Sequence, residues 1–442
     1  MTPSASPSPR ARGTPLVTPG FLAGFILVVS LFFLWAIANN FNDILIRQFQ
    51  KALDLNRAEA GLIQFVFYIG YFVMALPAGM IMRKFGYRAG ILLGLGLYAV
   101  GALLFYPAAE VRQYAAFLAA LFILAAGAAC LETAANPYVV AFGDPSRAAQ
   151  RLNLAQAFNG IGAVLAPILG GLFIFSGVEL DVSARAALSP ADLDAWRASE
   201  AATVQLPYLV LAGVVILVAA GVSRVRLPDV RPDGGTHLQP GQARSGTWRR
   251  LLSNKVLIGA VVAQFFYVGA QVGVWSYFVD FATYATPQVS ERNAAFLLSI
   301  SLALFMFGRF AGAALMSRAP PARLLIVFAV ANVILCGLAA TLPGGLAVAA
   351  LVGTGLFMSI MFPTLFALGV RDLGADQSLG SSLLIMSIIG GALMPPLMGW
   401  VSHGHGGLRL ALVVPMAAFG VVAAFGLFYR RIERTAAQGV QA

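Results

Sequence analysis

Twelve apolar runs, each long enough to cross a lipid bilayer as a helix, divide this sequence. A spanning helix needs roughly 20 mostly apolar residues. The chain is 59% hydrophobic and 11% charged, whereas a soluble protein carries about 25% charged residues. The runs lie at 20–46, 58–82, 88–107, 114–141, 150–176, 204–222, 254–281, 291–316, 322–341, 345–370, 378–401 and 408–429. The sequence therefore predicts an all-α, multi-pass integral membrane protein.

Positive charge gathers in every second loop between the predicted spans. Arg83, Lys84 and Arg88 lie between the second and third spans, and Arg147 and Arg151 follow the fourth. The central loop and the loops after the eighth and twelfth spans are also rich in arginine. Because cytoplasmic loops collect Lys and Arg, we expect both termini to be cytoplasmic. The same rule explains the net charge of +11 without a nucleic-acid partner.

The two halves of the sequence resemble each other. The segment Gly162–Gly170 of the fifth span matches Gly391–Gly399 of the eleventh, and the region around Pro137 in the fourth span matches Pro363 in the tenth. Gly79 before one basic loop corresponds to Gly312 before another. Two parallel six-helix halves around a midplane site are the architecture of the major facilitator superfamily.

This repeat predicts the domain boundaries. We expect a disordered cytoplasmic tail at 1–19, an N-terminal six-helix bundle at 20–222 and a cytoplasmic linker at 223–253. A C-terminal six-helix bundle at 254–429 and a second cytoplasmic tail at 430–442 would complete the chain.

Two carboxylates interrupt the predicted spans. Asp43 lies near the end of the first span and Glu132 lies within the fourth. An acid at the centre of a bilayer costs about 2.5–3.5 kcal/mol on insertion scales, so such residues usually face a water-filled path or carry a proton. We therefore predict that Asp43 and Glu132 couple transport to protons.

Asparagines accompany both acids. Asn39, Asn40 and Asn42 precede the first acid, and Asn136 follows the second by one helical turn. A run of four polar residues within five positions cannot face lipid on all sides, so one face of the first helix is expected to meet a wet cavity. We predict that these asparagines bind substrate. The alternative is that one or two of them only satisfy backbone or helix–helix contacts.

Amide and aromatic side chains recur in the first, fifth and seventh spans. Amides both donate to and accept from hydroxyl groups, and aromatic rings pack against the apolar face of a sugar. On the seventh span the spacing i, i+3, i+7, i+11 places four of them on one helical face. We predict a sugar-binding platform; the alternative for the rings is an interfacial aromatic belt. Its residues are Trp35, Gln156, Asn159, Gln264, Tyr267, Gln271 and Trp275.

Three cations are candidates for gating. Arg83 and Lys84 lie in the loop after the second span, and Arg309 lies within the eighth, where it could also snorkel to the interface or pair. The sequence has no Gly-Lys dipeptide, so it contains no Walker A loop for ATP. It also lacks metal-ligand spacings and a nucleophile–base pair. We therefore expect no metal, no cofactor and no enzymatic activity.

Several strings together resemble the fucose:proton symporter family of the major facilitator superfamily. The resemblance runs from about residue 20 to 430 and is most specific in the first, fourth, fifth and seventh spans. The matching strings are Phe33–Ala36, Ala38–Leu45, Cys130–Tyr138, Arg151–Asn159, Gln264–Gln271 and Trp275–Tyr277.

The resemblance implies a proton-driven sugar uptake protein of the bacterial inner membrane. Asp43 and Glu132 match the family's proton-coupling carboxylates, and Gln156 and Asn159 match its cavity residues. The family's glucose/galactose branch typically carries an acid at the position of Gln271, so this chain looks closer to the fucose permeases. The loop after the second span departs from the superfamily pattern, because Arg-Lys replaces the usual Asp-Arg, and the usual gating ion pair is not assumed.

We therefore interpret the chain as a secondary active transporter, a proton-coupled symporter that carries L-fucose or a related small neutral hexose into the cell. Its expected partners are the sugar, protons and the lipid bilayer, and it is expected to work as a monomer. Two alternatives stay open: a glucose/galactose-type transporter and a passive facilitator. A proton-coupled drug exporter is disfavoured by the amide-rich wall.

Overall fold

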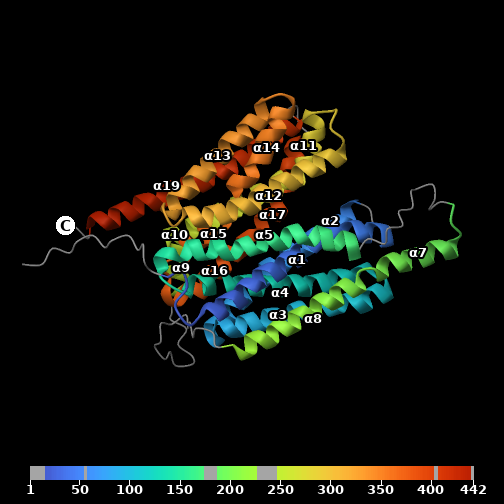
Figure 1. The fold of residues 1–442 in the computed structure, drawn as a ribbon, viewed down its shortest axis with the longest axis horizontal. Coiled ribbons are helices and arrows are strands. Elements are labelled where there is room, and N and C mark those ends of the chain that lie inside the picture. The colour runs from blue at the N-terminus through green and yellow to red at the C-terminus, as the bar shows by residue number, and fades with distance from the viewer. Residues whose placement is uncertain (1–14, 54–56, 174–186, 226–245, 403–406, 440–442) are drawn as a thin grey trace, which may run out of the picture.

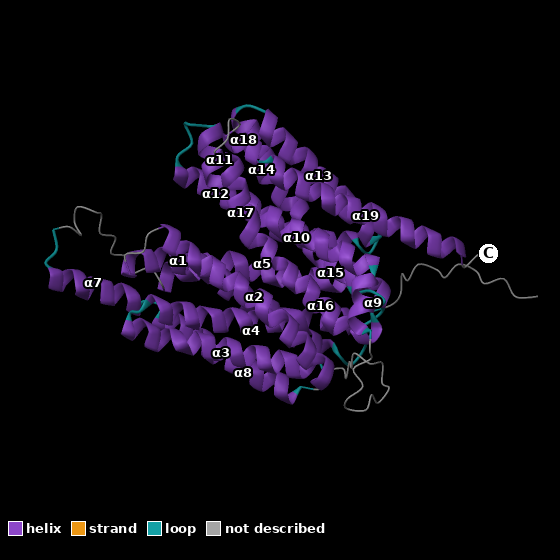
Figure 2. Cartoon of the chain, turned by 180° about the vertical axis from the view of Figure 1, so that it is seen from behind, coloured by secondary structure: helices purple, strands orange, loops and turns teal. Residues whose placement is uncertain are grey.

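The computed structural model describes residues 15–53, 57–173, 187–225, 246–402 and 407–439. Every regular element in these ranges is an α- or 3-10 helix, so the predicted all-α class is confirmed. The helices form two groups, which meet near α9, α15 and α16 and diverge toward α7 and α11 (Figures 1 and 2).

The first group packs mainly within itself: α3 against α4 and α8, α2 against α4, and α1 against α5. These contacts bring the acid-bearing helix α4 to the centre of the group. Its members are α1 (Leu22–Leu53), α2 (Arg57–Phe85), α3 (Tyr87–Val111), α4 (Tyr114–Ala141), η1 (Pro145–Arg147), α5 (Ala148–Phe173), α7 (Pro190–Ala202) and α8 (Gln205–Arg224).

A short helix, α9 (Thr247–Ser253), lies within the predicted linker and precedes the second group. In this group α13 and α10 pack against α19, α10 packs against α17, and α12 packs against α14. Its members are α10 (Lys255–Ser276), α11 (Phe278–Ala285), α12 (Glu291–Leu315), α13 (Pro321–Thr341), α14 (Gly344–Met358), α15 (Met361–Gly369), η2 (Gly374–Asp376), α16 (Gln377–Met386), η3 (Ser387–Ile389), α17 (Gly390–Ser402), α18 (Gly407–Ala411) and α19 (Val413–Gly439).

Ten helical stretches among the described residues are long and apolar enough to cross a membrane, and α1 adds the shorter apolar stretch Leu22–Ile37. Together with α5, they occupy the positions of the twelve predicted spans. One predicted loop is different, because α7 is a helix that precedes α8. Ser189 starts α7, since its Oγ accepts a hydrogen bond from the Asp192 N–H at 3.2 Å and Pro190 stands at the first helical position.

Four predicted helices of the second half are interrupted rather than continuous. The seventh breaks at Tyr277, the tenth after Met358, the eleventh at η3 and the twelfth at Leu412. In the tenth, the break lies one turn before Pro363, which has no N–H for the Ser359 carbonyl. Periodicity predicts helices but does not register such breaks.

The basic loops lie together at one end of the molecule. Arg83 Nη2 is 3.4 Å from Thr247 Oγ1 of α9, and Arg88 donates to the Ser223 carbonyl at the end of α8. The α4–α5 turn, the α12–α13 turn and the final helix line a common cavity there. We call this the basic end; that it faces the cytoplasm stays a prediction.

Arg151 is not the loop cation that the charge pattern suggested. It belongs to α5, is fully buried, and donates to the carbonyls of Val139 (3.1 Å), Gly143 (3.0 Å) and Asp144 (2.9 Å) after or within the last turn of α4. It also donates to the Leu16 carbonyl at 3.2 Å. Arg151 therefore satisfies carbonyls left over at the end of α4 and holds part of the predicted tail against the first group.

Candidate functional site

Glu132 and Asn136 form the centre of a buried polar cluster. They lie one turn apart on α4, whose residues from Leu124 to Val139 are all buried, and Glu132 is only 6% exposed. The Glu132 carboxyl lies within hydrogen-bonding reach of Asn136 and of Tyr71 on α2, and the charge of Arg309 acts on it. The spacing i, i+4 on one helix brings the acid and the amide together.

Arg309 reaches this cluster from the other group of helices. Its Nη1 donates to the backbone carbonyl of Gln156, to Gln156 Oε1 at 3.1 Å and to Asn159 Oδ1 at 3.2 Å. Its guanidinium carbon lies 4.5 Å from the centroid of the Phe305 ring on the same helix. Arg309 is 5% exposed, so the alternative that it snorkels to the interface is wrong for this conformation.

Two amides of α5 complete a continuous path of hydrogen bonds. Gln156 Nε2 donates to Asn136 Oδ1 at 3.3 Å, and Asn159 Nδ2 donates to the Phe32 carbonyl of α1 at 3.1 Å. We call Tyr71, Glu132, Asn136, Gln156, Asn159 and Arg309 the cross-bundle cluster. Asn136 lies between Gln156 and the Glu132 carboxyl, so it links the acid to the amides of α5.

Among the predicted aromatic residues, Trp275 approaches this cluster through Phe305. Its ring is 5.1 Å from that of Phe305, nearly perpendicular to it, and Phe305 in turn lies beneath Arg309. The Trp275 indole N–H is buried without a partner in the described part of the chain. Trp35, by contrast, is 1% exposed and packs 4.3 Å from Phe32, so its ring is covered in this conformation.

The predicted face of the seventh helix divides into two environments. Tyr267 is fully buried, and its hydroxyl donates to the Met358 carbonyl of α14 at 2.9 Å. Gln264 is also fully buried, and neither amide atom has a hydrogen-bond partner within the described residues. Gln271 is half-buried. These residues lie at helical spacing on α10, but the Tyr267 hydroxyl is already hydrogen-bonded to another helix.

Of the three predicted asparagines of α1, the structure describes the side chain of Asn40. Asn40 Nδ2 donates to the Ala36 carbonyl of its own helix at 2.7 Å, which is the alternative considered for such residues. Asn39, Asn42 and Asp43 belong to α1, but their side chains lie outside the described residues. Their predicted roles stay predictions.

One of the two gating candidates of the first half, Arg83, adjoins the linker helix α9. Arg83 and Arg250 both point to Thr247 Oγ1, at 3.4 and 3.1 Å. Arg250 also pairs with the Asp376 carboxylate, whose Oδ2 lies 2.9 Å from Arg250 Nη2. Helix α9 thus contacts both groups at the basic end. Lys84 is exposed and lies over the Phe85 ring.

Sequence reasoning missed two residues of this region and left a third out of the predicted binding residues. Tyr71 adjoins Glu132, and Phe305 lies between Trp275 and Arg309. The third, Asn153 on α5, donates to Thr364 Oγ1 of α15 at 3.3 Å. A tyrosine or phenylalanine in an apolar span carries no signal of its own. Asn153 gave a signal, because a third amide precedes Gln156 at helical spacing.

The fold and this cluster define a membrane transporter of the major facilitator class, not an enzyme. The Major Facilitator Superfamily profile matches residues 20–383. The crystal structure of FucP, a transporter of this superfamily in the outward conformation, is similar with a TM-score of 0.87 and 41% identity, covering 92% of this chain and 99% of that chain. The proton:xylose symporter XylE, 14% identical with a TM-score of 0.66, shares the fold over 91% of this chain and 95% of its own.

Two relatives identify the family to which the chain belongs within this superfamily. The L-fucose-proton symporter of Escherichia coli is 43% identical over 411 residues, covering 92% of this chain and 93% of the relative. The glucose/galactose transporter of Brucella abortus is 37% identical over 407 residues, covering 91% and 94%. The chain belongs to the fucose:proton symporter family of the major facilitator superfamily, as the sequence predicted.

Proposed function

We propose that this protein is a proton-coupled symporter that carries L-fucose or a related neutral hexose into the cell. The observation that carries the proposal is the buried Glu132, which shares a polar cluster with Arg309 of the other half. A buried carboxyl linked to both moving halves is suited to coupling protonation with their relative position. The 43% identity to the L-fucose-proton symporter supports the choice of sugar and ion.

The proposed orientation places the basic end in the cytoplasm. Its loops carry most of the arginines, in keeping with the positive-inside rule. The two halves touch at this end through Gly79 and Ser382, and they diverge at the other (Figure 1). The conformation is therefore interpreted as outward-facing, and its similarity to outward FucP supports this interpretation.

In the proposed cycle Glu132 gains a proton from the outer side. Neutral Glu132 lowers the cost of closing the halves over a buried site, because a charged carboxylate is expensive to desolvate. Arg309 favours the charged form when the proton has left, so the same cation contributes to release of the proton inside. Asp43 is proposed as a second protonation site or a residue that tunes the switch.

The sugar is proposed to bind beside the cross-bundle cluster. Asn136, Gln156 and Asn159 would bond its hydroxyls, and Trp275 would pack against its apolar face. Gln264, Gln271 and the asparagines of α1 would line further walls.

We also propose the boundaries of the two bundles, the oligomeric state and the membrane in which the protein works. The bundles are placed at 20–222 and 254–429, joined by the linker 223–253, and the packing of α1–α8 and α10–α19 mainly within each group supports this division. The protein is proposed to work as a monomer in the bacterial inner membrane.

Transport into proteoliposomes tests the function. Labelled L-fucose should accumulate when an inward proton gradient is imposed, and unlabelled sugar should alkalinise the outer medium. Competition by D-galactose, D-glucose and D-mannose would identify a glucose/galactose-type specificity. Uptake without alkalinisation would establish a passive facilitator, and proton-driven efflux of lipophilic cations without sugar transport would establish a drug exporter.

A further inference from the structure

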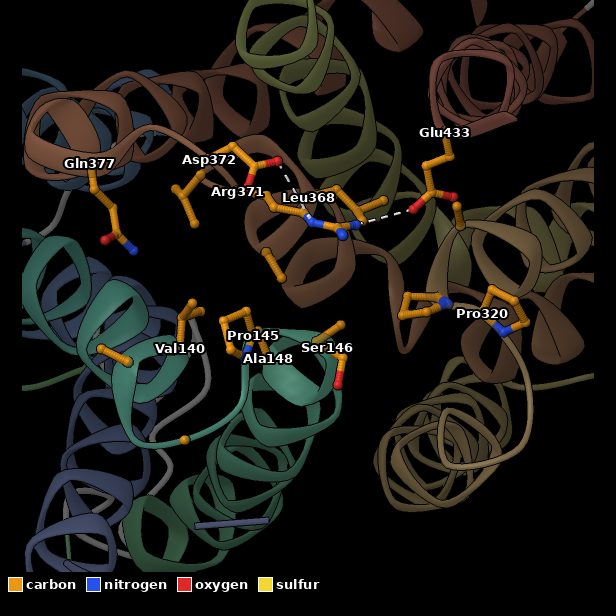
Figure 3. Close-up of a pocket in the computed structure, with 18 residues that line it drawn as sticks. Val140, Pro145, Ser146, Ala148, Pro320, Leu368, Arg371, Asp372, Gln377 and Glu433 are labelled. Carbon is orange, nitrogen blue, oxygen red and sulfur yellow. Dashed lines mark hydrogen bonds and ion pairs between the residues drawn. The ribbon is translucent and has the colours of Figure 1, made fainter. Parts of the chain in front are cut away.

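A cavity of about 350 Å³ lies at the basic end, between the two halves and away from the cross-bundle cluster. Its residues on one side belong to the α4–α5 turn, and those on the other belong to the ends of α15 and α19 and the start of α16 (Figure 3). We call it the basic-end cavity. Because both halves contribute walls, it is complete only while they are closed together at this end.

The two walls differ in chemistry. Arg371, Asp372, Gln377 and Glu433 of the second half face Val140, Pro145 and Ala148 of the first half across the space (Figure 3). The second half thus supplies charged and amide groups, and the first half supplies a mostly apolar surface. This combination suits a sugar, whose hydroxyls need donors and acceptors and whose ring has an apolar face.

The charges select a neutral ligand over a phosphorylated one. Arg371 is the only cation among the described residues that line the cavity, and its Nη1 is 3.1 Å from Glu433 Oε1 and 2.8 Å from the Tyr429 hydroxyl. Asp372 adds a second carboxylate, 3.8 Å from Arg371 Nε. The lining therefore carries a net charge of −1, and its one cation is already paired with a carboxylate, so it offers a phosphate no unpaired positive group.

Size and exposure set the expected affinity. Ligand pockets usually measure about 300–1,000 Å³, so this cavity suits a monosaccharide rather than a larger ligand. The side chains of Arg371 and Asp372 are 46% and 89% exposed, so water competes for their hydrogen bonds and binding in the millimolar range is expected. A symporter reaches such concentrations of sugar inside the cell only when uptake has succeeded.

We propose that the basic-end cavity binds the accumulated neutral sugar from the cytoplasmic side and holds the two halves closed there, so that the product slows its own uptake. This inference rests on the proposed function. Elsewhere at this end the halves already touch, since a Cβ on Gly79 would lie 1.9 Å from Ser382 Oγ. A sugar in the cavity adds contacts across the halves only in the closed state, and it favours that state by about 11-fold at ten times its dissociation constant.

Labelling of a single thiol at the cavity tests the binding. The natural cysteines, Cys130 and Cys336, are buried, and Ser146 lines the cavity and is exposed. The rate of maleimide labelling of the purified Ser146→Cys variant is measured with L-fucose from zero to about 100 mM. We expect labelling to slow about fivefold or more, with half of the effect at millimolar sugar. L-fucose 1-phosphate and sucrose should give no protection.

Two further substitutions, each added to the Ser146→Cys variant, distinguish sugar binding at this cavity from binding at the transport site. Gln156→Leu weakens the cross-bundle cluster and should leave the protection unchanged. Gln377→Leu should raise the sugar concentration needed by about tenfold, the loss of one or two hydrogen bonds. The matched control is Gln150→Leu at the same end, because Gln150 bonds Arg147 and does not line the cavity.

The outcomes are distinguishable from those for the proposed function. Protection that disappears with Gln156→Leu, is unaffected by Gln377→Leu, or is given equally by sucrose would overturn the inference. If the unmodified protein accumulates L-fucose under a proton gradient and no protection is seen, the inference fails and the proposed function stands. If no sugar is accumulated at all, the proposed function itself fails.

Discussion

Helix α4 and the interrupted pair α14–α15 hold equivalent places in the two halves, and they have the same framework with a different polar content. Pro137 corresponds to Pro363, and the hydroxyls of Thr133 and Ser359, one turn earlier, bond carbonyls of their own helices at 2.7 and 2.6 Å. Yet Glu132 corresponds to Met358. The residues that shape the backbone are repeated, and the acid is not.

The second half supplies its charge from a different helix. Arg309 lies on α12, three residues before Gly312, and the equivalent position before Gly79 of α2 is Leu76. The acid of one half and the cation of the other thus meet at non-equivalent positions and act on each other. The repeated residues thus shape the two halves, and the residues that depart from the repeat form the site.

The largest effect is expected at Glu132 itself. Glu132→Gln keeps the shape of the side chain and one acceptor oxygen but cannot exchange a proton, so proton-driven accumulation of sugar should be lost while exchange of labelled for unlabelled sugar continues. Accumulation and exchange are measured in proteoliposomes. Met358→Leu at the equivalent position is the control and should transport nearly normally, since volume-conserving changes cost less than about 1.5 kcal/mol. Normal accumulation by Glu132→Gln would refute the proposed role of the acid.

The next largest effect is expected at Arg309. Arg309→Lys keeps the charge but loses the planar fork that contacts both Gln156 and Asn159. Loss of about 2–3 kcal/mol of charged hydrogen bonds predicts a fall of roughly 30- to 150-fold in the initial rate of uptake. Leu76→Ile is the matched control. Equal uptake by Arg309→Lys and Leu76→Ile would show that the charge alone matters, and not its contacts across the halves.

The helices and the buried acid could be predicted from the sequence, but the contacts between the two halves could not. Apolar length located all twelve helices, and the cost of charge in hydrocarbon singled out Glu132. The pairing of Arg309 with α5 could not be predicted, because contacts between distant helices leave no periodic signal. The break after Met358 was also missed, since Pro137 occupies the equivalent place in α4 without interrupting it.

Repeat-related glycines should respond to the same substitution in different ways. A Cβ on Gly79 would meet Ser382 Oγ of the other half at 1.9 Å, and a Cβ on Gly312 would meet Ile360 Cγ2 of its own half at 2.1 Å. Overpacking costs about 1–3 kcal/mol. Gly79→Ala should therefore hinder closure of the basic end and lower uptake about tenfold at unchanged thermal stability.

Gly312→Ala should instead lower the thermal midpoint of the purified protein. Gly96→Ala controls for both, because a Cβ there would have no neighbour within 4 Å. Ser382→Gly should partly restore uptake to the Gly79→Ala variant. If Gly79→Ala lowers the thermal midpoint as much as Gly312→Ala does, the two contacts do not differ in the way that the structure indicates.

The smallest effect is expected where the two halves agree. Thr133→Val and Ser359→Ala each remove one hydroxyl that bonds a carbonyl within its own helix, and each should cost about 1 kcal/mol or less. Both variants should take up sugar within about twofold of the unmodified protein, because neither hydroxyl is assigned a role in coupling. Proton-driven uptake and thermal midpoints of both are measured in parallel. If Thr133→Val alone loses accumulation, the hydroxyl beside Glu132 belongs to the proton path, and the asymmetry of the halves extends beyond the two charged residues.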